Sequence, residues 1–387
     1  MRNWGLFSSF FLCGTVLAAE PSQHWVQRDG FQAIAERFTT QKTGHVAFMG
    51  GSITEMNGYR PMVMDYLTKK FPQTKLQFTN AGIASTCSTT GAFRLKTDVL
   101  DQGKVDLFFL EFAVNDDQDA RHTAEECVRG MEGIIRQLKT TNPDAGIVVV
   151  YFVNESMLAT TQKGAVPLTI LNHEKVCEHY HVSSVNVAKE LAAQISAEKF
   201  SWKQYGGVHP APAGNRLCAN LVEQLLEANW KKTTVSKMPD QPLDPQSYTQ
   251  GKFLDWQHIN VAPGWNLAKP DWQKIPGSWR DRFKNIPLLS TTEPDKEQSV
   301  DFTGRGVGIY LLAGPDAGVL EVSIDGAAYK KFPLKHQFSK GLHYPRSIMF
   351  AENLAREKHS VKMRVVADSS KTTSATAVRI VNILINE

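Results

Sequence analysis

Cysteine is scarce in this sequence, and neither sign of charge is in large excess. Beyond the first residues there is also no long apolar run. Five cysteines among 387 residues exclude a small disulfide-stapled scaffold. The net charge of +4 is smaller than the basic excess typical of a nucleic-acid-binding protein. Glycine and proline, at 27 and 18 residues, are too few for a collagen-like or low-complexity chain. The length is enough to bury a large core, so we expect a folded protein of two or three domains.

Residues 1–19 have the pattern of a secretory signal peptide. Arg2 supplies a positive charge, residues 6–17 are mostly apolar, and Ala18-Ala19 are the small residues expected at a cleavage site. The apolar run is shorter than the ~20 residues that a membrane-spanning helix needs. We therefore expect an exported protein, secreted or periplasmic, that binds neither a membrane nor nucleic acid.

Export would permit disulfide bonds. Four cysteines follow the expected signal peptide: Cys87, Cys127, Cys177 and Cys218. Four cysteines allow three complete pairings, and the sequence does not choose among them. Free thiols buried in the core are an equal alternative.

Between residues 45 and 230, strand-forming runs alternate with helical periodicity. Strands are expected at residues 45–49, 76–78, 105–112, 146–152 and 183–187, and the clearest helices at 59–71, 123–140 and 213–230. Alternation in steps of ~30 residues predicts βαβ units and a parallel sheet. Ligands of such sheets bind beyond the carboxyl ends of the strands.

A proline-containing segment, residues 236–250, predicts a linker between residues 20–235 and a second domain of residues 251–387. The second domain has an all-β pattern. Its clearest strands are expected at residues 306–312, 318–324, 360–366 and 377–384. Short strands at such spacing, separated by turn signals, predict a β-sandwich.

Four residues mark the ends of elements in the first domain. Ser52 follows a Gly-Gly turn that can present its hydroxyl at the edge of the sheet. Gly82 and Asn115 follow the next two expected strands and can offer N–H donors to an oxyanion. His209 precedes the last helix, in a glycine- and proline-rich loop where it can act as a general base. Each alone is an ordinary turn or cap residue, so the order of all four carries the argument.

In this order, the four residues resemble the sequence blocks of SGNH (GDSL-type) hydrolases, a family of esterases and lipases. The resemblance covers residues 45–230 and implies a three-layer α/β/α domain. It implies that Ser52 is the nucleophile and His209 the base. It also implies an oxyanion hole formed by the N–H groups of Ser52 and Gly82 and the side chain of Asn115.

The sequence departs from the family pattern at two positions. Ala113 stands where the third block usually has glycine, and Gly206 stands where an aspartate usually orients the histidine. Two arrangements remain open. A backbone carbonyl could hold His209 in a Ser-His dyad, or a carboxylate from elsewhere, such as Asp116 or Glu155, could replace the missing one.

No metal and no cofactor are expected. His173, Cys177, His179 and His181 look briefly like metal ligands, but residues 173–180 follow the core-facing period of a helix. Arg60 and Arg94 are expected to be solvated, the alternative being contacts with an acidic sugar. The aromatic residues of the second domain favour core filling over sugar binding. They are Trp256, Trp265, Trp272, Trp279, Tyr310, His343 and Tyr344.

These observations together predict a secreted serine esterase with a small ester substrate. An acylated carbohydrate is the favoured class, and removal of O-acetyl groups from a polysaccharide the favoured reaction. A general short-chain esterase and an O-acetyltransferase that uses the same serine are alternatives within the enzymes. A catalytically silent carbohydrate-binding protein is the alternative from another class. The sequence gives no oligomeric state.

Overall fold

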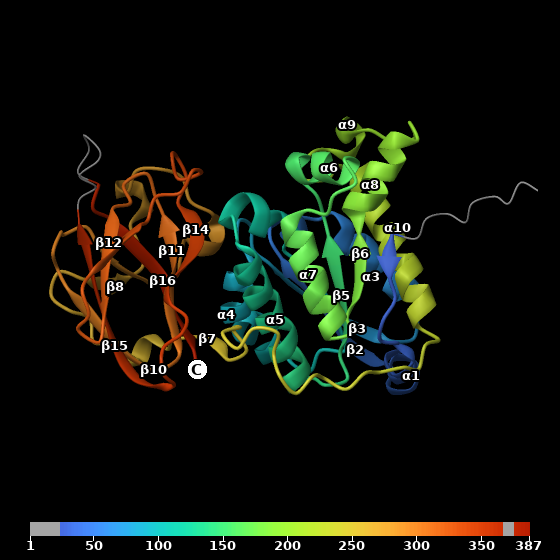
Figure 1. Ribbon diagram of the computed structural model, residues 1–387, viewed down its shortest axis with the longest axis horizontal. Coiled ribbons are helices and arrows are strands. Elements are labelled where there is room, and N and C mark those ends of the chain that lie inside the picture. Colours follow the sequence, from blue (N-terminus) through green and yellow to red (C-terminus); the bar gives the residue numbers. More distant parts are fainter. Residues whose placement is uncertain (1–23, 367–374) are drawn as a thin grey trace, which may run out of the picture.

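A computed structural model describes residues 24–366 and 375–387 (Figure 1). The expected signal peptide lies outside the described residues. Among them, no helix combines the length and the apolar character needed to span a bilayer.

A six-stranded sheet forms the centre of the first domain, in the order β1-β6-β5-β4-β2-β3. The strands are β1 (Trp25–Val26), β2 (Thr43–Gly50), β3 (Lys75–Gly82), β4 (Leu107–Glu111), β5 (Gly146–Tyr151) and β6 (Ser183–Asn186). Strands β2 to β6 pair in parallel, while β1 is antiparallel to β6. Every residue of β4 and β5 is buried, as expected for parallel strands with both faces covered.

Helices form a layer on each face of this sheet (Figure 1). The helices are α1 (Gln32–Gln41), α2 (Ser52–Glu55), α3 (Tyr59–Lys70), α4 (Ser88–Asp98), α5 (Ala124–Thr141), α6 (Glu155–Gln162), α7 (Leu168–His179), α8 (Val187–Ser196), α9 (Trp202–Tyr205) and α10 (Pro212–Asn229). Helices α4, α5 and α7 pack together in one layer, and α3, α8 and α10 in the other. The amphipathic α5 begins with a capping box between Thr123 and Glu126.

The second domain consists of two antiparallel sheets. One has the order β10-β15-β12-β13 and the other β14-β11-β16-β9-β8, with β7 also paired to β16. The strands are β7 (Gly251–Phe253), β8 (Asn266–Ala268), β9 (Leu288–Thr291), β10 (Gln298–Gly304), β11 (Gly306–Ala313), β12 (Val319–Ile324), β13 (Lys330–Pro333), β14 (Tyr344–Ala351), β15 (Glu357–Val366) and β16 (Val378–Asn386). The two sheets enclose a core of their own, so the predicted α/β domain and β-sandwich are both confirmed.

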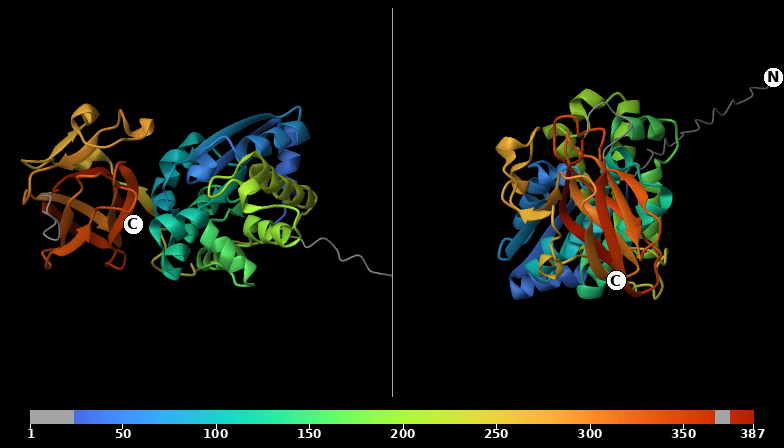
Figure 2. Two further views of the ribbon diagram at one scale, coloured as in Figure 1. Left: turned by 90° about the horizontal axis from the view of Figure 1, so that it is seen from above. Right: turned by 90° about the vertical axis from the view of Figure 1, so that its left-hand side faces the viewer.

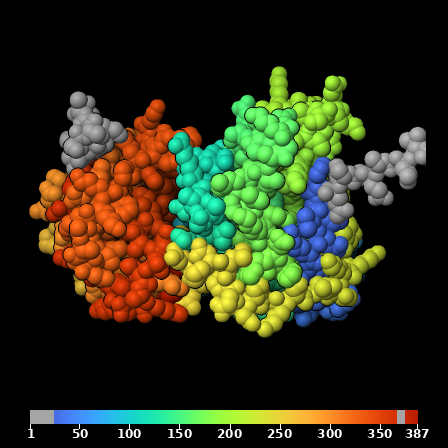
Figure 3. Space-filling model, in the orientation of Figure 1, coloured from blue at the N-terminus to red at the C-terminus, as the bar shows by residue number. Residues whose placement is uncertain are grey.

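Residues 231–250 lie along the surface of the first domain, as the yellow segment of Figure 3 shows. Glu132 of α5 accepts hydrogen bonds from the amides of Leu243 and Asp244. The hydroxyl of Ser247 also donates to Glu132. A buried carboxylate therefore fixes the end of the segment that was expected to be a linker.

The sandwich packs beside the α4 and α5 layer (Figure 2). Helix α4 contacts β7, β14 and β16. The hydrophobic core of the first domain continues into the second through buried side chains, among them Trp272, Phe283, Tyr310 and Leu384. Shared apolar burial of this kind holds the two domains in one orientation.

Candidate active site

The carboxyl ends of β2, β3 and β4 meet at one edge of the sheet. Gly50, at the end of β2, pairs with Gly82 of β3 on one side and with Glu111 of β4 on the other. Ser52 begins helix α2 two residues later. As the first residue of a helix it has no intrahelical acceptor for its N–H. The strand register therefore brings three expected site segments together.

Ser52 and His209 lie within hydrogen-bond distance of each other. The Oγ atom of Ser52 is 2.8 Å from Nε2 of His209, although 157 residues separate them. Ser52 is partly exposed and His209 is exposed. A neutral imidazole can accept the hydroxyl proton at this distance, which is the geometry of a nucleophile and its base.

The loop of His209 is fixed by its neighbours. The amide of Ala211 donates to the carbonyl oxygen of Tyr205 at 2.7 Å, which closes the loop around Gly206. Asn215 of α10 donates from Nδ2 to the carbonyl oxygen of Pro210 at 2.5 Å. Tyr205 itself is fully buried. Hydrogen bonds to the backbone of this loop thus hold the segment that carries the imidazole.

No described residue forms a hydrogen bond with Nδ1 of His209, whose one hydrogen-bond partner is Ser52. Asp116 is not the missing acid of a triad. Its carboxylate accepts from the N–H and hydroxyl of Ser88, at 2.8 and 2.6 Å, and lies 2.9 Å from Nε2 of His173. Glu155, the other candidate, is the exposed first residue of α6. The described geometry is that of a Ser-His dyad.

Restoring the family aspartate at position 206 is expected to damage the loop rather than assist catalysis. Gly206 has φ +103°, and a Cβ there would lie 2.2 Å from the backbone nitrogen of Ala211. We expect Gly206→Asp and Gly206→Ala to lower both kcat/KM and the midpoint of thermal unfolding, because both add the clashing Cβ to a strained backbone.

Gly207→Asp is the matched control for this prediction. Gly207 also has a positive φ, +84°, but no atom lies within 4 Å of an added Cβ. It should carry only the backbone strain, about 1–2 kcal/mol. A Gly206→Asp protein that is more active than wild type, with the acid limb of its kcat/KM profile shifted upward, would contradict the expectation.

Asn115 lies against the turn that carries Ser52. It begins a π-helical turn, η2 (Asn115–Ala120), and is 3% exposed. Its Nδ2 donates to Oδ2 of Asp119 at 2.6 Å, which leaves the second amide hydrogen for another acceptor. A Cβ on Gly51 would lie 2.0 Å from its Oδ1. Only glycine at position 51 permits this contact between Asn115 and the residue before Ser52.

The loop after β3 uses most of its amides internally. Gly82 N–H donates to Oδ1 of Asn80 at 3.0 Å. The amides of Ile83, Ala84 and Thr86 donate to Gly50 O, Glu55 Oε2 and Ile83 O. Ser85, in a left-handed conformation with φ 68°, is the residue of this stretch whose amide has no partner among the described residues. Sequence reasoning missed it, because only the fold shows that Asn80 occupies the amide of Gly82.

Glu111 is a buried carboxyl group beside the turn that leads to Ser52. Its side chain accepts from the N–H of Gly51 and, at 3.2 Å, from the hydroxyl of Thr54. Burial is the largest effect and raises the pKa of Glu111 from its ordinary value of 4.5 to about 7. The carboxyl group therefore keeps its proton in mildly acid solution while it orients the residue before Ser52.

This buried acid predicts a pH-dependent stability difference between the wild type and Glu111→Gln. Between pH 4.5 and about 7, the unfolded chain loses the proton that the folded chain keeps, so the stability of the wild type falls as pH rises through this window. Above this pH window the wild type has lost on the order of 3 kcal/mol of its free energy of unfolding. Glutamine does not titrate and still accepts the Gly51 hydrogen bond. Urea unfolding at pH 5 and pH 8 measures the free energy of unfolding of both proteins. Relative to the wild type, Glu111→Gln should be more stable at pH 8 than at pH 5. An equal difference at both pH values would contradict the assignment.

The expectations for Arg60 and Arg94 need correction. Arg60 and Arg94 are not solvated: Arg94 is 1% exposed and donates to the carbonyl oxygens of Ala81 and Gly50. Arg60 is also buried and donates to Thr54 O. Both brace the loops of the site. Of the seven aromatic residues singled out in the second domain, five are buried, Trp265, Trp272, Tyr310, His343 and Tyr344, while Trp256 and Trp279 are partly buried and pack against the two cores. The four described cysteines are buried free thiols.

The second domain reaches the loops of the site. Arg280 donates to Ala84 O at 3.2 Å and to the hydroxyl of Ser85 at 2.8 Å. Arg282 donates to Gly82 O and pairs with Glu55, each at 3.4 Å. The loop after β3 is therefore held from both domains.

The chain is similar to known proteins in family and in fold. Residues 48–217 match the GDSL-like lipase/acylhydrolase family. None of the curated proteins matches the sequence. Among solved structures, the chain is similar to a two-domain esterase (CEX) active on acetylated mannans. The form co-crystallised with mannopentaose has a TM-score of 0.76 at 20% identity, covering 93% of this chain and 96% of that chain. A second structure of the two-domain esterase has a TM-score of 0.75 at 21% identity, covering 94% and 98%. At such identity the likeness establishes the two-domain fold.

Proposed function

Because the first domain of this chain belongs to the GDSL-like lipase/acylhydrolase family, we propose that the protein is a serine esterase that removes O-acetyl groups from a carbohydrate. The observation that carries the proposal is the 2.8 Å contact between Ser52 Oγ and His209 Nε2 at the carboxyl end of the parallel sheet. We also propose that the protein is exported, as residues 1–19 suggest.

Ester cleavage proceeds in two steps at this site. Ser52 Oγ attacks the acyl carbon while His209 Nε2 takes the hydroxyl proton. His209 then gives the proton to the departing sugar oxygen, which leaves an acetyl-Ser52 intermediate. In the second step His209 removes a proton from water, the resulting hydroxide attacks the acetyl carbon, and the proton passes from His209 to Ser52 Oγ as acetic acid departs and loses its own proton to solvent.

The negative charge on the carbonyl oxygen needs donors that are already in place. We assign the N–H of Ser52 and the side chain of Asn115 to this oxygen. For the third donor we favour the N–H of Ser85, because it is unpartnered, while that of Gly82 is given to Asn80. Gly82 acts in this role only if the Asn80 side chain moves away.

Two features support a carbohydrate substrate. The dyad is open to solvent, with His209 exposed, so an extended substrate can reach it. The chain also shares its two-domain architecture with an esterase active on acetylated mannans. Because one fold can serve different substrates, acetate release from a glycan must be measured directly.

The assay compares acetate release from acetylated mannan and from p-nitrophenyl acetate by the wild type and by Ser52→Ala. Release from both substrates by the wild type alone supports the proposal. Turnover of p-nitrophenyl acetate without acetate release from any acetylated glycan would indicate a general short-chain esterase. Transfer of acetyl to an acceptor glycan in preference to water would indicate a transferase. The absence of any turnover above Ser52→Ala would favour a silent carbohydrate-binding protein, which the lone imidazole of His209 makes worth testing.

A further inference from the structure

A cluster of thiols and imidazoles surrounds the residue that follows Asn115. Asp116 is fully buried in the π-helical turn η2. Five residues from four parts of the chain contribute to the cluster: Cys87, Asp116, His122, Cys127 and His173. They form two triads that share Asp116, Cys87–Asp116–His122 and Asp116–Cys127–His173, each with its side-chain donor atoms within 4.8 Å of one another. Ester hydrolysis uses none of these thiols or imidazoles.

The carboxylate of Asp116 is held in a fixed orientation. Ser88 donates to both of its oxygens, from N–H to Oδ1 and from the hydroxyl to Oδ2. His173 Nε2 lies 2.9 Å from Oδ2, which is an ordinary hydrogen-bond length. The triad with His173 is therefore explained by hydrogen bonding, whereas Oδ1 still faces the other triad.

A ring nitrogen of His122 that has no hydrogen bond faces Oδ1 of Asp116. The Nε2 atom of His122 lies 3.3 Å from Thr89 Oγ1, so the Nε2–H group can donate there and leave a lone pair on Nδ1. This Nδ1 atom is buried and without a hydrogen-bond partner among the described residues, 3.4 Å from Asp116 Oδ1. Two lone pairs that face each other need a cation between them, either a proton or a metal ion.

The separation favours a metal ion. The nitrogen and the oxygen lie 3.4 Å apart and form no hydrogen bond with each other. This distance equals the ~3.4 Å between two ligands that each lie ~2.0–2.1 Å from a tetrahedral ion. The sulfur of Cys87, a ring nitrogen of His122 and a carboxylate oxygen of Asp116 all lie within 4.8 Å of one another, at most ~1.3 Å beyond the distance expected between zinc ligands. A thiolate, an imidazole and a carboxylate are a ligand set that suits zinc.

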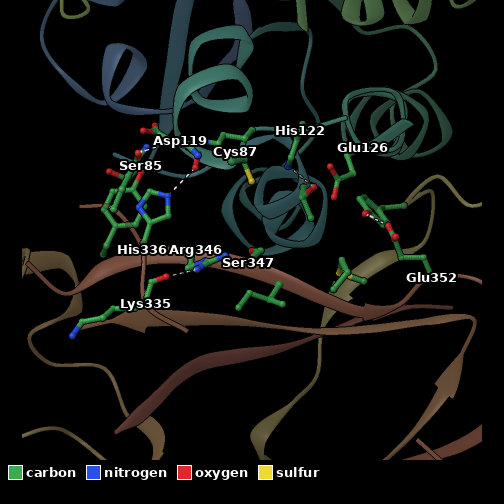
Figure 4. Close-up of a pocket in the computed structure, with 18 residues that line it drawn as sticks. Ser85, Cys87, Asp119, His122, Glu126, Lys335, His336, Arg346, Ser347 and Glu352 are labelled. Atoms are coloured by element: carbon green, nitrogen blue, oxygen red, sulfur yellow. Dashed lines mark hydrogen bonds between the residues drawn. The ribbon is translucent and has the colours of Figure 1, made fainter. Parts of the chain in front are cut away.

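Cys87 and His122 also border a cavity of about 420 Å³ between the two domains (Figure 4). The cavity gives an ion a path to the triad and room for a water molecule as the fourth ligand. Arg346 lines the same cavity and adds a positive charge nearby. Its NH1 group donates to the carbonyl oxygens of Leu334 and Lys335 on the sandwich side.

We propose that Cys87, Asp116 and His122 bind one zinc ion, with a water molecule from the interdomain cavity as the fourth ligand. Binding releases the thiol proton of Cys87 to solvent, and the neutral imidazole of His122 ligates through Nδ1. The ion fixes the start of α4 to the turn η2, which carries Asn115. The sequence did not point to this site, because its three ligands are spaced by 29 and 6 residues in no known zinc pattern.

Cobalt(II) substitution tests the proposal. The full chain is treated with chelator, dialysed and titrated with Co²⁺ while its absorption is recorded. We expect one equivalent to bind and to produce a thiolate-to-cobalt charge-transfer band in the near ultraviolet, which Zn²⁺ then abolishes by displacement. Cys87→Ser should lose the band. Cys177→Ser, which removes another buried thiol, in α7, should keep it.

Three results would overturn the proposal: no band in the wild type, a band that survives Cys87→Ser, or a band lost in Cys127→Ser but not in Cys87→Ser. A second measurement needs no variant, in case Cys87→Ser does not fold. Zn²⁺ should slow the alkylation of Cys87 by iodoacetamide in the native wild-type protein, as read by peptide mapping. An unchanged rate of alkylation would also contradict the site.

Discussion

Ser52→Ala and His209→Ala should each lower kcat for an acetyl ester by a factor on the order of 10⁶, and the double variant should be no slower than either alone. The reason is that the two side chains act as a unit. Without Nε2 to accept the proton, the hydroxyl of Ser52 is a weak nucleophile, and without the hydroxyl the imidazole has no attacking group to activate. Their 2.8 Å contact is the structural basis of this coupling.

A serine-directed organophosphonate provides an independent measurement. One label per chain should appear in the peptide between Phe48 and Arg60, and Ser52→Ala should abolish it. Ser299→Ala is the control, because it removes an exposed hydroxyl of the second domain. Labelling of another residue together with an active Ser52→Ala protein would refute the assignment of the nucleophile. Losses that multiply in the double variant would show that Ser52 and His209 act independently.

Much of this site could be predicted from the sequence, because local signals mark the ends of parallel strands. The Gly-Gly turn before Ser52 and the buried run before Asn115 fix which residues emerge at the edge of the sheet. The structure confirms the strands behind both residues. His209 was predictable because glycine and proline shape its loop before the start of α10.

The rest of the site depends on contacts between distant side chains. Asp116 was one of two carboxylates considered as a replacement for the missing aspartate beside His209. The π-helical turn instead places it against Ser88 and His173, in the interior. Likewise, nothing in the local sequence shows that Arg94 crosses to Gly50 O. The cluster of Cys87, Asp116 and His122 has the same origin, since only the packing of α4 against α5 brings these residues together.

Replacing Asn115 by alanine should lower kcat by ~10²–10³, equivalent to ~2.7–4 kcal/mol of transition-state stabilisation, with little change in KM. Asn115 touches the turn of Ser52 through Gly51 and holds one amide hydrogen to Asp119. The other hydrogen strengthens its contact only as charge develops on the substrate oxygen, so the loss falls on kcat. Steady-state kinetics on p-nitrophenyl acetate measure the two constants separately.

Two companion variants separate this role from a structural one. Asn115→Asp keeps the shape but places a negative charge at the oxyanion, so we expect a loss of kcat at least as large as that of alanine. Ser85→Gly keeps the backbone N–H and relieves the positive φ of 68°, so it should retain kcat. Because Asn115 is buried, thermal unfolding of each variant must accompany the kinetics. An Asn115→Ala protein that folds like the wild type and loses affinity while keeping kcat would show that Asn115 binds the substrate in its ground state. A loss confined to kcat in a stable protein would place its amide at the oxyanion, beside the N–H of Ser52.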